Sequence, residues 1–174
     1  MWLDWLVFQN DTLDELKAAW RNQSFDIIYT DEMLEEWVDV IGRAQFKLSL
    51  EQQNHKTVEL KAIARRVETQ GKPLNPIACK DKDDQIFIDT ALTHGAAWLI
   101  SKDRHLLMLK NRARKQNVLV GTVEDWLAVW ASFKVKPMGF GQNQVKWAQL
   151  LMGGSIGCCQ RLITVIPAQA GIHA

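Results

Sequence analysis

The segment DQIFIDTALTHGAAWLISKD, residues 84–103, decides the fold class of this chain. Its first half, Gln85 to Thr93, is an apolar segment predicted to form a buried helix that is capped by Gly95. Ala97 to Ile100 has the composition of a strand, and Asp103 lies three residues beyond it. A helix that leads directly into a short apolar strand is typical of α/β proteins with a parallel sheet.

The same alternation of helix and strand continues on both sides of this segment. Phe25 to Tyr29 is a short apolar run, and Thr30 is placed to cap a helix through Ile41. Ser49 and Gln52 form a capping-box pattern, which opens a helix predicted to reach Gln70. The other expected elements are helices at 12–22, 105–112 and 123–130, and strands or extended segments at 76–79 and 118–120.

These elements predict a three-layer α/β/α fold with a short parallel sheet. The sheet has only about four short strands, which is thin for this architecture, so we expect a strand to be missing at its front. If that strand is missing, Trp2 and Trp5 are expected to be exposed. Residues 1–132 are predicted to form the domain, and 133–174 a tail outside it, because glycines cluster there and periodicity is lost. Within the tail, 163–166 has strand composition, and the last nine residues resemble the translation of a bacterial intergenic repeat.

Length and composition indicate one globular domain rather than a disordered or disulfide-rich chain. The 174 residues are 47% hydrophobic and 24% charged, close to ordinary globular values. Three cysteines without zinc or disulfide spacing, no basic leader and no long apolar run predict a cytoplasmic protein. The net charge of +1 hides an asymmetry, since residues 1–40 hold ten acidic and two basic side chains.

Three carboxylates fall where strands end or helices begin. Asp84 opens one predicted helix, Asp103 follows a strand, and Glu36 lies on the helix that begins after Thr30. Carboxylates that meet at one edge of a parallel sheet suit a hard divalent cation such as Mg²⁺. Taken singly, each has a plainer explanation: a helix cap for Asp84, a solvated loop for Asp103 and an acidic helix face for Glu36.

Three segments in series resemble the PIN domain family. They are TDEMLEEW at 30–37, CKDKDDQIF at 79–87 and HGAAWLISKD at 94–103, and the similarity covers roughly residues 1–131. The branch that they resemble is that of toxin components of bacterial toxin–antitoxin pairs. This resemblance implies a ribonuclease, a hydrolase that depends on Mg²⁺ or Mn²⁺ and uses four acidic residues.

The resemblance assigns three of those four residues. Glu36 matches the second, Asp84, eleven residues before Gly95, matches the third, and Asp103 matches the fourth, so all three are expected to be catalytic and to bind metal. In the family the first ligand follows an N-terminal, central strand, and the resemblance implies that this chain begins after that strand and its ligand. Asp4 matches a later position and does not replace it, so we expect weak or no nuclease activity.

Other residues are predicted to assist. Asp81, Asp83 and Ser101 are expected to support the site without being primary ligands, whereas His94 and His105 are expected at the surface or at helix ends. RNA and a cognate antitoxin protein are the implied partners, a homodimer is left open, and no membrane association is expected. Basic residues expected to contact RNA phosphates are Lys102, Arg104, Lys110 and Arg112.

Two other functions compete with this one. The chain could be a non-catalytic remnant that keeps a protein-binding surface, because the first ligand is missing. It could also be an aspartyl phosphotransfer domain with its nucleophile within Asp81–Asp84. The run 76–80 is not a hydrophobic strand that would deliver such an aspartate, which argues against the second alternative.

Overall fold

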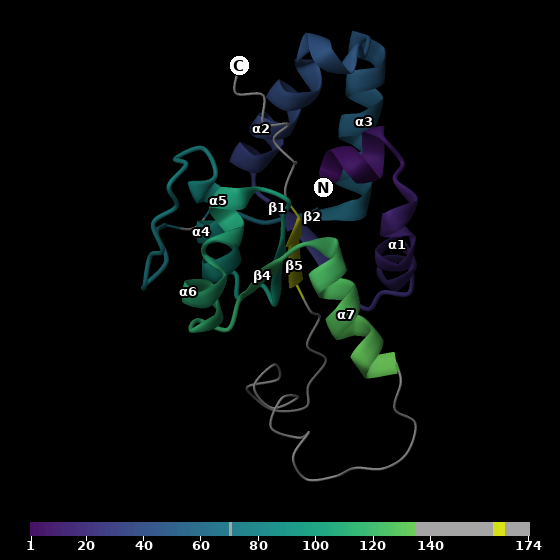
Figure 1. Cartoon of the computed structure of the whole chain (residues 1–174). Helices are drawn as coiled ribbons and strands as arrows, with labels where there is room; N and C mark the ends of the chain where they lie inside the picture. The colour runs from purple at the N-terminus through teal and green to yellow at the C-terminus, as the bar shows by residue number, and fades with distance from the viewer. Residues whose placement is uncertain (70, 135–161, 166–174) are drawn as a thin grey trace.

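The structure, a computed structural model, describes residues 1–69, 71–134 and 162–165 (Figure 1). Within these residues five strands form one sheet in the order β2-β1-β5-β3-β4, and every adjacent pair is parallel. The predicted α/β class with a short parallel sheet is therefore confirmed. The strands are β1 Asp26–Tyr29, β2 Ala64–Arg66, β3 Trp98–Ile100, β4 Leu119–Gly121 and β5 Leu162–Val165.

Helices cover both sides of the sheet. Figure 1 shows α4, α5 and α6 on one side, with α1 and α7 on the other. The α-helices of the described residues are α1 Asp14–Arg21, α2 Asp31–Gly42, α3 Leu50–Ile63, α4 Gln85–Thr93, α5 Arg104–Leu107, α6 Lys110–Arg114 and α7 Val123–Lys134. Short non-α turns at Leu3–Val7, Asp11–Leu13 and Ala44–Phe46 complete the helical segments.

Two helix starts follow the capping signals in the sequence. The Thr30 side chain accepts a hydrogen bond from the backbone N–H of Met33, which fixes the first turn of α2. At α3 the Ser49 hydroxyl accepts from the Gln52 N–H at 3.2 Å, and the Gln52 side chain accepts from the Ser49 N–H at 2.8 Å. These hydrogen bonds confirm both predicted helix starts. They could be predicted because a cap depends only on residues three positions apart in the sequence.

The long helix predicted from Ser49 to Gln70 is wrong in its second half. α3 ends at Ile63, and the next three residues form β2, in which Ala64 pairs with Ile27 of β1. The Val67 N–H then donates to the Tyr29 carbonyl. A ladder with β1 satisfies these backbone groups as well as a helix would, so the tertiary partner overrides local propensity.

The segment expected to be extended at 76–79 forms no strand. The Gln85 side chain takes the place of a neighbouring strand: its amide donates to the Ile77 carbonyl at 2.9 Å and accepts from the Cys79 N–H at 2.8 Å. The first residue of α4 thus anchors the loop that precedes it. The single helix expected at 105–112 is also divided, into α5 and α6.

The centre of the sheet is occupied by β5. Ile163 pairs with Ile27 of β1, and Thr164 pairs with Leu99 of β3. The expectation that residues 133–174 lie outside the domain is therefore wrong at 162–165, and α7 also continues to Lys134. Without β5, β1 and β3 would each present a row of unpaired backbone groups, which explains why an apolar segment inserts there. The other tail residues lie outside the described part of the chain.

The tryptophans near the N-terminus are buried rather than exposed. Trp2 is 1% and Trp5 is 9% exposed, and the ring of Trp5 meets that of Trp20 edge-on at 5.9 Å. Trp37 and Trp126 lie in the same core. The expectation of exposed Trp2 and Trp5 is wrong because this segment packs against α3 and the core.

Candidate active site

Asp84 is the most deeply buried carboxylate of the predicted set. It stands immediately before α4, yet its side chain makes no capping hydrogen bond to that helix. The residue is 1% exposed, and neither carboxylate oxygen has a hydrogen-bond partner among the described residues. A helix cap does not explain this side chain, because a capping carboxylate would accept from the first-turn N–H groups.

Neighbouring carboxylates surround Asp84. Burial is the largest cause that raises the pKa of Asp84, to about 7, and the charge of the nearby Asp103 carboxylate follows. The charges of Asp81 and Glu36 act in the same direction. The structure thus brings together Glu36, Asp84 and Asp103, which lie on three separate elements; their roles as ligands and catalysts stay a prediction.

The loop after β3 fixes Asp103. Its Oδ1 accepts from the backbone N–H groups of His105 at 2.6 Å and Leu106 at 3.3 Å, so it caps α5. The Asp103 N–H donates to the Ser101 hydroxyl at 2.9 Å, and Ser101 itself is 1% exposed. Ser101 therefore shapes the loop that presents Asp103, and its supporting role in a metal site stays a prediction.

Glu36 projects from the middle of α2. Its Oε1 is buried and has no hydrogen-bond partner within the described chain, although an Arg43 guanidinium nitrogen lies 3.8 Å away. Burial raises the pKa of Glu36, and the Arg43 charge opposes this. Asp39 binds the same guanidinium at 2.9 Å, whereas Glu35 is exposed. One acidic helix thus presents a single carboxylate to the site.

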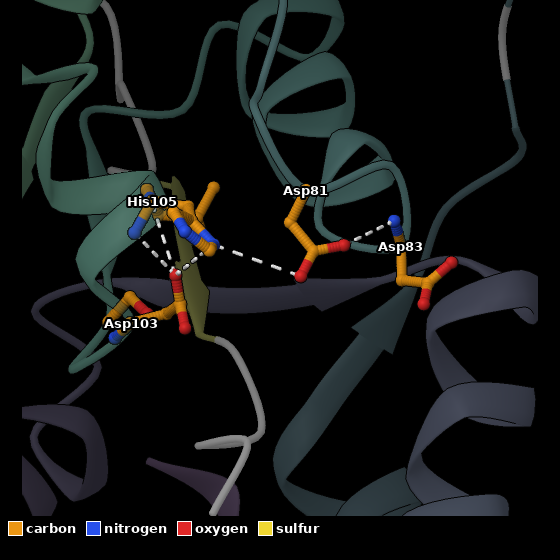
Figure 2. A network of polar contacts seen from close by, with 6 residues as sticks. Asp81, Asp83, Asp103 and His105 are labelled. Atoms are coloured by element: carbon orange, nitrogen blue, oxygen red, sulfur yellow. Dashed lines mark hydrogen bonds and ion pairs between the residues drawn. The ribbon is translucent and has the colours of Figure 1, made fainter. Parts of the chain in front are cut away.

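His105 lies at a helix end, in the first turn of α5, and its ring also meets two carboxylates of this cluster. Its Nδ1 lies 3.8 Å from Asp81 Oδ2 and 3.9 Å from Asp103 Oδ1, and Figure 2 shows the ring between the two carboxylates. Asp81 also accepts from the Asp83 N–H at 3.0 Å, while Asp83 itself is exposed. Sequence reasoning missed His105 because it lies 24 residues from Asp81, and only the fold joins them.

The donor set fits a divalent cation. One ligand atom from each of Asp81, Asp84 and His105 lies within 4.8 Å of the others. Asp84 adds the strongest argument, because a buried carboxylate without hydrogen bonds is costly unless a proton or a cation neutralises it. Asp81, which the sequence assigned to a supporting role, offers one of these three ligand atoms.

Most of the basic residues expected at RNA have partners within the chain. Lys102 donates to Asp4 at 2.8 Å, Lys110 to Asp125 at 3.3 Å, and Arg112 to the Ala78 carbonyl at 3.2 Å. Arg104 is exposed at the start of α5. Each partnered side chain still reaches the surface, so these contacts do not by themselves prevent binding of phosphate.

Comparison with known protein families identifies the family of this chain. The family model described as PIN domain matches residues 1–105, more than half of the chain. The chain belongs to the PIN domain family, whose members are nuclease-like proteins that use divalent metals and typically act on RNA. Neither the curated proteins nor the solved structures gave a match. No helix in the described ranges combines the length and apolar character needed to cross a membrane.

Proposed function

We propose that this chain carries the catalytic site of a metal-dependent endoribonuclease, the toxin component of a toxin–antitoxin pair. The observation that carries the proposal is the buried, unpartnered carboxylate of Asp84 beside Asp103 and Glu36. Membership of the PIN family supplies the reaction class, hydrolysis of RNA phosphodiesters. Mg²⁺ or Mn²⁺ is the expected cofactor.

Each residue has a distinct task in this proposal. Asp84 and Asp103 hold the ion at the ends of α4 and β3, and Glu36 adds a carboxylate from α2. When bound, the ion supplies charge for the phosphate and activation of the attacking water. Ser101 and the backbone of α5 keep Asp103 oriented, so that ligand geometry is set before RNA arrives.

Basic side chains around the mouth of the site hold the RNA backbone. Arg104 is the leading candidate because it is exposed and lies next to Asp103. Lys102, Lys110 and Arg112 contribute after exchanging their internal partners for phosphate, which needs positive charge but no base-specific contact. RNA is thus the proposed substrate. A cognate antitoxin protein, which the family resemblance implies, is the proposed protein partner.

The test is RNA cleavage by the full chain with Mg²⁺ or Mn²⁺ and with a chelator. We expect slow cleavage that requires metal and that Asp84→Asn abolishes. Asp89→Asn is the matched control: it lies on the same helix, but its carboxylate accepts from the Gln85 side chain, and asparagine retains an acceptor. Normal cleavage by Asp84→Asn would contradict the proposal.

A chain that binds metal but cleaves no RNA would favour the non-catalytic alternative, a module that retains its surface for an antitoxin. The aspartyl phosphotransfer alternative has less support, because the segment before Asp81 is a loop rather than a strand. Incubation with a phosphate donor would leave a covalent acyl phosphate on that protein and none on a nuclease.

A further inference from the structure

We propose that His105 is a direct ligand of the ion and that it shifts the preference of the site from Mg²⁺ toward a first-row transition ion. This inference rests on the metal-dependent function proposed above. It concerns a residue that neither the family match nor the three expected carboxylates assign.

The distances place the imidazole where a ligand is needed. Ligand atoms of Asp81, Asp84 and His105 lie within 4.8 Å of one another. Opposite ligands of one ion stand roughly 4.2 Å apart when each bond is about 2.1 Å long. Small rotations of exposed side chains are enough to close this difference, since His105 is 28% and Asp81 31% exposed.

Asp84 supplies an independent reason to place an ion here. Both of its oxygens are buried and lack a hydrogen-bond partner within the described residues, and one of them lies within 4.8 Å of the ligand atoms of Asp81 and His105. Asp103, by contrast, uses Oδ1 for two backbone N–H groups of α5. One oxygen of Asp103 is thus already occupied by backbone N–H groups. The imidazole of His105 is close enough to supply a ligand atom in its place.

The backbone holds His105 in position. The His105 N–H donates to Asp103 at 2.6 Å, so the side chain leaves the chain in the first turn of α5 (Figure 2). The ring is thereby oriented between Asp103 and Asp81. An imidazole ligand favours transition ions, whereas Mg²⁺ keeps oxygen ligands and water. A mixed carboxylate–imidazole set therefore discriminates between the two classes of ion.

The full chain tests this with Mn²⁺ and Mg²⁺ as the probes. In the Mn²⁺ complex, electron spin echo measurements should detect a directly bound imidazole nitrogen in the wild type and in His94→Ala. His94 is the control because its ring contacts the Glu68 carbonyl, outside the cluster. The nitrogen signal should disappear in His105→Ala.

Calorimetry measures the preference between the two ions. His105→Ala should weaken Mn²⁺ binding about tenfold or more, as loss of a metal-site interaction does, and Mg²⁺ binding by less than about threefold. His105→Gln, which retains a polar side chain, gives the second variant should His105→Ala fold poorly, and the same change in preference is expected.

The outcomes separate the two proposals. Absence of a bound nitrogen in the wild type, or equal loss of both ions in the His105 variants, overturns this inference. If Asp84→Asn still abolishes binding of both ions, the proposed function stands without it. A wild-type chain that binds neither ion overturns both proposals.

Discussion

Asp84 shows how burial turns an ordinary acidic residue into a group sensitive to its surroundings. Burial first, and then the nearby carboxylates of Asp103, Asp81 and Glu36, make the ionised form of Asp84 unfavourable. A bound cation would offset this cost. The sequence identified Asp84 only through the resemblance of its segment, because a helix cap explained the same position equally well. The structure separates the two explanations, since the side chain caps nothing.

The first prediction concerns the stability of the metal-free protein against pH. The pKa of Asp84 is about 7 in the folded chain and about 3.9 when unfolded. Between these values the folded state keeps a proton that the unfolded state has lost, so this contribution to stability falls as pH rises from about 4 to 7. Asp84→Asn removes it and should raise the free energy of unfolding at pH 7.5 by roughly 1–3 kcal/mol.

Urea unfolding in chelator, from pH 4.5 to 8, measures this effect as the difference between variant and wild type. The difference matters because the buried amino group of Met1, with its pKa lowered to about 5, gives the opposite slope. That contribution is common to both proteins and cancels. Asp89→Asn serves as the control, and parallel curves for wild type and Asp84→Asn would refute the prediction.

Among the helices and strands, Gly95 makes the turn from α4 into β3 possible. Its φ of +61° is a left-handed conformation, and no atom lies within 4 Å of the position that a Cβ would take. Gly95→Ala should therefore cost about 1 kcal/mol of stability through the backbone alone.

Thermal unfolding of Gly95→Ala against Gly71→Ala checks that prediction. Gly71 also has open space around it but no positive φ. Equal melting temperatures for the two variants would show that the left-handed turn carries no strain.

A second prediction at this scale concerns β5. Thr164→Pro removes a backbone N–H between β1 and β3, where proline is not tolerated, and should destabilise the full chain by about 2 kcal/mol or more. Thr164→Val keeps the N–H and the branched side chain and should cost much less. Equal stability of the two variants would place residues 162–165 outside the sheet and restore the predicted tail.

The elements that could be predicted are those with local signals. Thr30 marks the start of α2, and the pair Ser49 and Gln52 marks the start of α3, each through a pattern no longer than four residues. Gly95 marks the end of α4. The β2 strand could not be predicted, because its residues become a strand only by pairing with the edge of β1, which is distant in the sequence. The same holds for the site residues. The carboxylates could be predicted because they follow a family pattern, whereas His105 could not, because only the tertiary structure brings it close to Asp81.

Across the whole molecule, the acidic first forty residues are joined to basic residues from later in the chain. Lys102 binds Asp4 across 98 positions, and Arg66 binds Asp31 across 35. Arg65 lies 3.8 Å from Asp26 in the same manner. The charge asymmetry of the sequence is thus partly compensated inside one domain, although exposed pairs contribute little stability individually.

Metal binding should raise the free energy of unfolding of the whole domain, because the ligand atoms come from separate elements that the ion would hold together. Saturating Mn²⁺, at about 100 times its dissociation constant, should add roughly 2.7 kcal/mol to the stability of the wild-type protein. Melting temperature against Mn²⁺ concentration measures the gain. Asp84→Asn should show none, and an equal rise in that variant would assign the effect to binding elsewhere.

The position of β5 also determines when the protein can fold during synthesis. Its two neighbours, β1 and β3, leave the ribosome long before residues 162–165, so the middle of the sheet is translated last. Until then the nascent chain carries two facing strand edges that other chains can bind. Slow translation or premature termination after α7 would therefore make the protein prone to aggregation. Rapid synthesis of residues 162–165 would protect it.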